Sequence, residues 1–261
     1  MSDLLFRNLL RNPSFAINQR GVSGSVVLTA GSYGHDGVKA GAGGATYTFA
    51  TSGLDTTLTI TAGSLILPIE GNMIEGNVVE YSTYTLRHEG TAAARIWQGT
   101  GNTGSGVYQR ADSAAPLGIA GLSANTQTNV EFSVGTILRP QFEPGAYATA
   151  FERRPPGVEM GLCRRYYQRI SAWVGSVTPG GDAVFTGQFS PEMSATPTIY
   201  FIDGTQLIHR PGVAFVGASS VTAGYLISGG GFISVTPETP IAAGETVAMF
   251  PTGGVFASAE I

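Results

Sequence analysis

The stretch that decides the fold consists of three runs, Thr46-Tyr47-Thr48-Phe49, Thr56-Thr57-Leu58-Thr59-Ile60 and Ser64-Leu65-Ile66-Leu67. Their β-branched, aromatic and aliphatic residues favour extended backbone. Gly, Ser and Asp, which are common in turns, separate the runs. The stretch therefore predicts short strands joined by turns.

The same pattern continues along the chain on both sides of this stretch. Val78–Leu86 alternates as a long strand would, Thr91–Gln98 follows a Gly-containing hairpin turn, and Asn129–Leu138 ends just before Pro140. Seven more short candidate strands lie between residues 183 and 258. This regular spacing, with almost no helical periodicity, predicts an all-β protein built of β-sandwiches or jelly rolls.

One segment departs from the β pattern. Residues 151–157 are rich in Pro, and Val158, Leu162 and Tyr166 then recur at intervals of four, which predicts a short helix over 156–167 with one apolar face. We take this helix as a domain boundary. The expected domains are a jelly roll over 1–150, a Pro-rich joint with a short helix over 151–170, and a β-sandwich over 171–261.

Composition excludes several classes of protein. The 14 basic and 18 acidic residues give a net charge of −4, which argues against a nucleic-acid-binding surface. The apolar runs are far shorter than the ~20 residues that span a bilayer. The start of the chain does not resemble a secretory signal, and Cys163 is the only cysteine, so no internal disulfide can form. We therefore expect synthesis in a reducing cytoplasm, without membrane insertion.

The low share of charged residues, 12%, has two explanations. Much of the monomer surface could be buried in an oligomer, where charged residues are depleted. Alternatively, a Thr-rich β surface needs few charges to stay in solution. Both remain open at the level of composition.

Residues suited to catalysis are scattered. His35, His88 and His209 share no spacing that would make a metal site, and no nucleophile motif is present. Sugar hydrolysis would need a pair of carboxylates, and no spacing singles out two of the candidates. Those candidates are Glu70, Glu75, Glu80, Glu89 and Glu131. The sequence predicts a protein that is not an enzyme and that needs no cofactor or metal ion.

Aromatic residues offer a different chemistry, the binding of carbohydrate. Tyr33, Trp97 and Tyr108 lie in or beside Gly-rich, turn-forming stretches, where loops could present their rings to the apolar face of a sugar. His35 and Asp36, next to Tyr33, would add hydrogen bonds to hydroxyl groups. The alternative for Trp97, which ends an alternating run, is a place in the core.

A resemblance to a known group of proteins rests on two stretches. Residues 8–21, Asn-Leu-Leu-Arg-Asn-Pro-Ser-Phe-Ala-Ile-Asn-Gln-Arg-Gly, resemble the opening of many bacteriophage tail-fibre and virion-surface proteins. That group often continues with Tyr-x-x-Asp-x-Trp, which residues 33–38 match except that Val38 replaces the Trp. Ile69-Glu70-Gly71 also resembles the segment before their next strand.

The second stretch, residues 141–154, runs Gln-Phe-Glu-Pro-Gly-Ala-Tyr-Ala-Thr-Ala-Phe-Glu-Arg-Arg. It contains Glu152 and Arg153 and leads into Glu159 and a Cys-x-Arg-Tyr-Tyr element. That element consists of Cys163, Arg165, Tyr166 and Tyr167. The resemblance implies that these residues form a structural joint, with Cys163 as a small buried hydrophobe.

The resemblance further implies a jelly roll like a carbohydrate-binding module, carried by a trimeric virion appendage with a C-terminal receptor-binding or trimerisation domain. We therefore expect a tail fibre, spike or head fibre at the virion surface. Its expected partners are two further copies of itself, other virion proteins and a host surface polysaccharide. The alternatives are a structural adaptor or decoration protein that binds no glycan and, less favoured, a capsule depolymerase.

Overall fold

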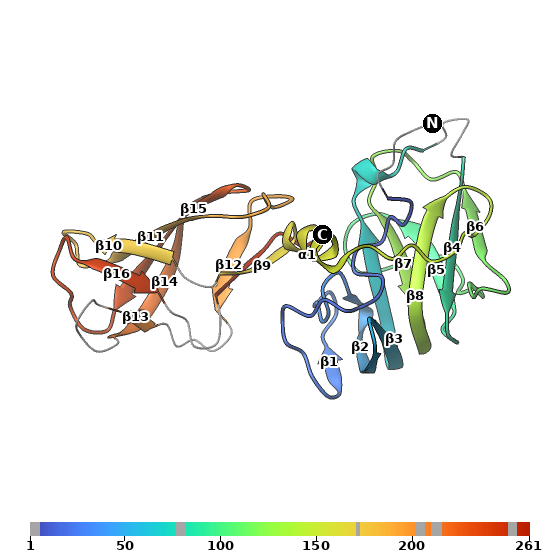
Figure 1. The fold of residues 1–261 in the computed structure, drawn as a ribbon, viewed down its shortest axis with the longest axis horizontal. Helices are drawn as coiled ribbons and strands as arrows, with labels where there is room; N and C mark the ends of the chain where they lie inside the picture. The colour runs from blue at the N-terminus through green and yellow to red at the C-terminus, as the bar shows by residue number, and fades with distance from the viewer. Residues whose placement is uncertain (1–5, 77–81, 171–172, 202–206, 210–215, 250–254) are drawn as a thin grey trace. The chain divides into compact units, whose positions relative to one another are not determined.

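The structure is a computed structural model, and it describes residues 6–76, 82–170, 173–201, 207–209, 216–249 and 255–261. Within these residues it has seventeen strands, one α-helix and one 3-10 helix (Figure 1), which confirms the predicted all-β class. By its internal contacts the chain divides into two compact units. The N-terminal unit comprises residues 1–163 with Ile261, and the C-terminal unit comprises residues 164–260.

The N-terminal unit is built from one branched antiparallel sheet. Its strands and its 3-10 helix are β1 (Val26–Leu28), β2 (Lys39–Ser52), β3 (Asp55–Ile69), η1 (Gly71–Met73), β4 (Thr83–Glu89), β5 (Ala94–Gln98), β6 (Leu117–Ala120), β7 (Thr128–Phe132) and β8 (Gly135–Pro144). The main order is β1-β2-β3-β8-β4-β6, and β7 branches off to pair with β3 and β5. Figure 1 shows β2 and β3 in blue beside the green β8.

Side chains of both branches share one core, so the β7-β5 branch and the β4-β6 branch face each other as the layers of a sandwich. Phe132 of β7 and Leu86 of β4 are fully buried in the same hydrophobic cluster. Tyr84 stacks on Phe142 with 5.5 Å between ring centroids. Burial of large side chains such as these contributes about 1.5–3 kcal/mol each.

The stretch that decides the fold forms two long strands in place of several short ones. Residues 46–49 lie in β2, whereas residues 56–60 and 64–67 both lie in β3. Gly63, at a φ of +72°, lies where the register of β2 and β3 shifts. A Cβ there would be 2.0 Å from the carbonyl oxygen of Gly44, so glycine permits a bulge where a turn was expected.

Two other predicted strands differ in their limits. The expected strand Asn129–Leu138 is two strands, β7 and β8, because the chain turns before Gly135, at a φ of +139°. Within Val78–Leu86, residues 78–81 lie outside the described residues, and β4 starts at Thr83.

Helix α1 (Pro156–Arg164) is three residues shorter than predicted, and its buried face is different. Val158 is exposed, whereas Glu159 and Cys163 are buried. Tyr166 is buried after the helix has ended, just before β9 begins. The spacing of four therefore marks the correct helix but the wrong face.

The C-terminal unit contains a closed barrel and a separate small sheet, which corrects the predicted sandwich. The barrel strands are β10 (Trp173–Val177), β11 (Ala183–Gln188), β13 (Leu207–His209), β14 (Val216–Ile227), β15 (Gly230–Pro237) and β16 (Thr246–Met249). The three-stranded sheet consists of β9 (Tyr167–Ile170), β12 (Thr198–Phe201) and β17 (Val255–Ser258). The barrel residues Phe185, Ile233 and Val247 are fully buried in the hydrophobic core of the C-terminal unit.

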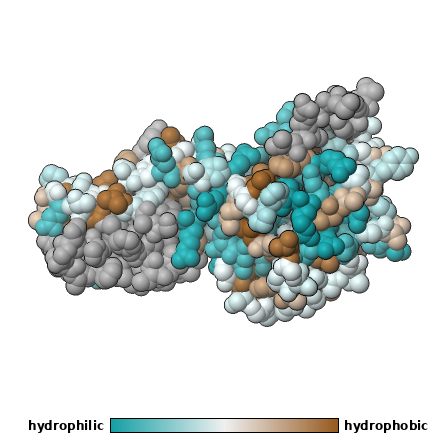
Figure 2. Space-filling model, in the orientation of Figure 1, coloured by the Kyte–Doolittle hydropathy of each residue, from teal (hydrophilic) through white to brown (hydrophobic). Residues whose placement is uncertain are grey.

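The surface is mostly uncharged. In the face drawn in Figure 2, hydrophobic residues of the N-terminal unit form separate patches among pale and hydrophilic ones. Over the described part of the chain, no helix is both long and apolar enough to cross a bilayer.

Candidate functional site

Two of the predicted carbohydrate ligands, His35 and Asp36, lie inside the N-terminal unit, where each is 1% exposed. The His35 ring packs edge-on against Phe49 and shares a hydrogen bond of 3.0 Å with the Tyr47 hydroxyl. Burial lowers the pKa of His35 to about 4, so the ring is neutral at physiological pH. This placement gives His35 a structural role in place of the predicted glycan contact.

Asp36 is also structural. Its carboxylate accepts hydrogen bonds from the backbone N–H of Gln19 (2.7 Å) and from its side-chain amide (2.6 Å). Asn12 donates to the Asp36 carbonyl oxygen at 2.9 Å. The Asp of the Tyr-x-x-Asp element therefore fastens the end of the 8–21 stretch to the loop before β2.

Tyr33 is half-buried beside two cations. The Arg20 guanidinium lies 5.5 Å from its ring centroid, and the Lys39 ammonium lies 5.8 Å from it. The Tyr33 ring is partly accessible, as a sugar-stacking aromatic would be, but the Arg20 and Lys39 cations both lie over the ring.

Trp97 belongs to a polar row on the side of the sheet away from the core. Glu131 of β7 pairs with Ile66 of β3 on one side and with Arg95 of β5 on the other, and Trp97 lies two residues beyond Arg95 on the same face. The indole is 6% exposed but is not part of the hydrophobic core cluster, so Trp97 is buried without occupying the core position considered from the sequence. Its Nε1–H donates to Glu131 Oε2 at 3.0 Å.

Glu131 is the centre of this cluster. Its Oε1 accepts hydrogen bonds from the hydroxyls of Ser64 and Tyr108, both at 2.7 Å. Its Oε2 accepts hydrogen bonds from Trp97 and from Arg95 Nε at 2.9 Å, and it forms an ion pair with Arg95 Nη2, also at 2.9 Å. Burial acts to raise the pKa of Glu131, but the hydrogen bonds from Arg95, Ser64 and Tyr108 outweigh it and hold the pKa below its ordinary value. A carboxylate held in this way stays ionised and cannot act as a general acid.

Tyr108 is the most accessible aromatic of the cluster. The Arg95 guanidinium lies 4.5 Å from its ring centroid, so the cation covers one face of the ring. Burial and the hydrogen bond to Glu131 raise the pKa of the Tyr108 hydroxyl. Glu131 thus fixes the positions of both Arg95 and Tyr108.

A Gly-rich loop, residues 99–108, covers this polar row. Asn129 donates to the carbonyl oxygen of Gly99 at 2.8 Å, Lys39 to that of Gly101 at 2.7 Å and Arg95 to that of Gly106 at 3.1 Å. A Cβ on Gly104 would lie 2.4 Å from Trp97 Nε1, so only glycine fits there. The loop explains why Trp97 is not presented to solvent.

A pocket of about 140 Å³ opens beside this cluster, between β5 and β6, each of which is an edge strand. Polar groups come from Arg95 and Gln109, and the rest of the lining is apolar or glycine. The lining residues are Arg95, Ile96, Gly106, Val107, Gln109, Leu117, Gly118 and Ile119. Val107 is 79% exposed at its rim. The arrangement suits a small ligand with one apolar and one hydroxyl-bearing side.

The two stretches that carry the family resemblance meet in the structure, although 119 residues lie between them. The backbone N–H of Asn8 donates to Glu152 at 2.7 Å, and that of Asn12 donates to Glu159 at 2.5 Å. Arg154 donates to the carbonyl oxygens of Asn8 (2.9 Å) and Leu10 (2.5 Å) and pairs with Glu159 at 3.3 Å. These contacts hold the two ends of the N-terminal unit's sequence side by side.

The other predicted joint residues also have structural contacts. Arg153 and Arg139 both bind Asp55 at 2.7 Å. The Cys163 thiol is buried. In the C-terminal unit, the Arg165 guanidinium lies 5.8 Å from the Tyr166 ring centroid, and Tyr167, fully buried, stacks on Phe256 at 5.0 Å.

Among the described residues, no group of three or more His, Cys, Asp and Glu is placed to hold a metal ion. Of the carboxylates considered for sugar hydrolysis, Glu80 lies outside the described residues.

Sequence reasoning missed Arg95, Ser64 and Asn129 as members of the cluster. The alternation in Arg95-Ile96-Trp97 and in Asn129-Val130-Glu131 was the available signal, because it places polar and aromatic side chains on one face of each strand. Which strands lie side by side depends on the sheet topology, which alternation does not reveal. No protein-family model matches this chain, and neither a curated protein nor a solved structure was found that matches it.

Proposed function

We propose that this chain is a structural subunit on the surface of a phage or phage-like particle, and that its N-terminal unit binds a glycan of the host cell. The observation that carries the glycan proposal is the pair of Arg95 and Tyr108, held in place by Glu131 beside the pocket between β5 and β6. Preorganised polar groups next to an apolar wall are what recognition of a sugar requires.

The particle assignment is supported by the contacts between the 8–21 and 141–154 stretches. Both stretches resemble virion-surface proteins. Asn8 joins them through a part-buried hydrogen bond to Glu152, and Asn12 bonds to Glu159 just after the second stretch. In this proposal the chain is a homotrimer, and three copies of a weak sugar site add avidity to each contact.

The pocket favours neutral sugars. The charge of Arg95 is balanced by Glu131 at 2.9 Å, so its remaining capacity is hydrogen bonding. Gln109, exposed at the rim, adds a side-chain amide that donates and accepts.

Binding of the full-length protein to an array of host-type glycans tests the proposal. Gly118→Leu adds a side chain to the pocket lining where nothing lies within 4 Å, and Gln109→Ala removes the rim amide. Both variants should lose at least tenfold in affinity. Gly43→Leu, at an exposed glycine of the same unit that also has open space, should bind as the native protein does. Equal binding by all four proteins would contradict the proposal.

A structural adaptor that binds no glycan is the second candidate, and one observation favours it. Three of the five predicted sugar ligands, His35, Asp36 and Trp97, are buried and engaged in internal hydrogen bonds. If the chain is such an adaptor, the intact assembly should bind no glycan on the array, and binding assays should detect only other particle proteins as partners.

A further inference from the structure

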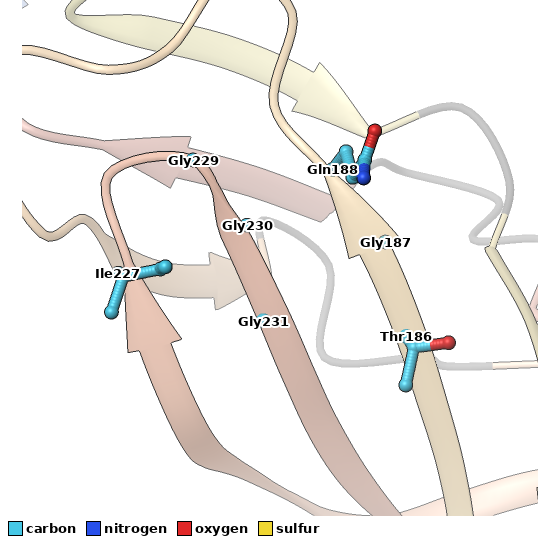
Figure 3. A pocket seen from close by; sticks show the side chains of 7 residues that line it. All are labelled: Thr186, Gly187, Gln188, Ile227, Gly229, Gly230 and Gly231. Atoms are coloured by element: carbon cyan, nitrogen blue, oxygen red, sulfur yellow. The ribbon is translucent and has the colours of Figure 1, made fainter.

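The C-terminal unit contains a second pocket, larger than the first, in a part of the chain where the sequence singles out no ligand-binding residue. Its volume is about 460 Å³, which is in the usual range for small-molecule sites. Seven described residues line it, as Figure 3 shows: Thr186, Gly187, Gln188, Ile227, Gly229, Gly230 and Gly231.

The pocket is a trough made by missing side chains on one strand of the barrel. In the sheet, Gln188 of β11, Gly230 of β15 and Ile227 of β14 lie in one row across three neighbouring strands. Side chains in such a row point to the same face. Gln188 and Ile227 therefore form two walls, and Gly230 between them leaves the floor bare (Figure 3).

The floor is fixed by the backbone. Gly230 and Gly231 have φ values of 149° and 153°, which side chains of other residues rarely allow. A Cβ on Gly230 would lie 2.4 Å from the carbonyl oxygen of Gly187, and a Cβ on Gly187 would lie 2.1 Å from the Trp173 indole. The trough is therefore a permanent feature of this packing.

The chemistry of the walls selects the ligand. None of the seven lining residues is charged, so the pocket offers no counter-ion to an anionic or cationic group. Ile227, 47% exposed, provides an apolar wall, and the hydroxyl of Thr186 and the amide of Gln188 provide donors and acceptors opposite it. Since adjacent strands lie about 4.8 Å apart, the two walls stand roughly 10 Å apart at the backbone.

We infer that this trough of the C-terminal barrel binds a neutral saccharide. The ring lies flat on the glycine backbone of β15, its apolar edge contacts Ile227, and its hydroxyl groups bond to Gln188 and Thr186. The inference does not rest on the glycan site proposed in the N-terminal unit, because no residue is shared between the two pockets.

One glycine allows the trough to be blocked without strain. Gly229 lies at its end, outside the left-handed region of backbone, and an added Cβ would meet nothing within 4 Å. Gly180 of the same unit is exposed, away from the trough, and its nearest atom would be 3.8 Å from an added Cβ. Gly229→Leu and Gly180→Leu are therefore a matched pair, one inside the trough and one outside.

The experiment is titration of the full chain with neutral gluco-, galacto- and manno-oligosaccharides and with a sialylated one, read by saturation-transfer NMR and calorimetry. At least one neutral oligosaccharide should bind, and the sialylated one should bind more weakly. In a Gly118→Leu background, in which the N-terminal pocket is filled, Gly229→Leu should abolish this binding, whereas Gly180→Leu should leave it unchanged. Thr186→Val and Gln188→Ala should each weaken it about three- to tenfold.

Several results would overturn the inference. These are no binding by any neutral oligosaccharide, preference for the sialylated one, or unchanged binding by both Gly229→Leu and Gln188→Ala. If Gly229→Leu does not fold, Gln188→Ala alone decides the matter, because its exposed side chain is not part of the core. Gly118→Leu, which alters the N-terminal pocket, should leave this binding intact, so the two sites can fail separately.

Discussion

Glu131 shows how one residue can organise a surface. Its carboxylate accepts four hydrogen bonds from four side chains and also forms an ion pair with Arg95 Nη2, while it is 1% exposed. Glu131→Gln keeps the shape of the side chain but removes its negative charge. The new NH2 group then faces hydrogen-bond donors where a carboxylate oxygen accepted from them. The partly buried Arg95 guanidinium then loses its counter-ion, so we expect the free energy of unfolding to fall by about 3 kcal/mol in urea denaturation at pH 7. The exposed Glu75→Gln serves as the control.

The loss of stability in Glu131→Gln should be smaller at low pH than at neutral pH. The folded pKa of Glu131 lies below the ordinary value of 4.5, so its contribution is present above that value and disappears as the pH falls through the folded pKa. The difference between the native protein and Glu131→Gln should therefore shrink in acid. A difference that stays constant from pH 7 to pH 3 would contradict the lowered pKa.

Glu159 should behave in the opposite way. Burial raises its pKa above 4.5, although Arg154 and the Asn12 N–H act against this shift. The stability linked to this group is therefore complete below pH 4.5 and is lost as the pH rises through the folded pKa. The stability of Glu159→Gln relative to the native protein should rise between pH 4 and pH 7, measured by chemical denaturation. The exposed Glu238→Gln gives the background, and a relative stability that falls with pH would refute the assignment.

At the scale of an element, the Gly-rich loop depends on Gly104. Gly104→Ala places a Cβ 2.3 Å from Glu131 Oε2 and 2.4 Å from Trp97 Nε1, so the loop must move. We expect a loss of about 1–3 kcal/mol and greater acrylamide quenching of Trp97, measured in a Trp173→Phe background. Gly43→Ala, with open space around it, should change neither quantity. Unaltered quenching in Gly104→Ala would mean that the loop does not cover the indole.

The elements that sequence predicts well are those whose cause is local. The β-branched runs at 46–49 and 56–60 are strands, and Pro156 opens a helix, because propensity acts within a few residues. The buried helix face was wrong since Glu159 is held inside by Arg154 and by Asn12, which is 147 residues away in the chain. No periodicity can report a partner at that distance.

The same limit applies to the candidate sites. The sequence shows Trp97 and Tyr108 in or beside Gly-rich stretches, but it does not show that the loop covers Trp97, because that loop is positioned by Lys39 and Asn129 from other strands. The trough in the barrel exists because Gly230 has Gln188 and Ile227 as neighbours across the sheet. Whether a glycine lines a pocket depends on which residues the strand register places beside it, and composition does not give the register.

At the scale of the whole molecule, charge and exposed apolar groups bear on assembly. Each copy has a net charge of only −4, so repulsion between copies is weak. Val27, Val107 and Tyr147 are 75%, 79% and 85% exposed in the isolated chain. Apolar and uncharged surface of this kind is typical of the centre of subunit interfaces.

We therefore expect native mass spectrometry at micromolar concentration to give three times the 27.0 kDa mass of one chain. Because only folded copies associate, the melting temperature should rise with protein concentration. Tyr147→Ser, at the most exposed of these three residues, tests whether this position lies in the interface, because only a residue covered by assembly should alter the measured mass. A single 27.0 kDa species, with a melting temperature independent of concentration, would show that the uncharged β surface is stable in water alone and would remove avidity from the proposed mode of glycan binding.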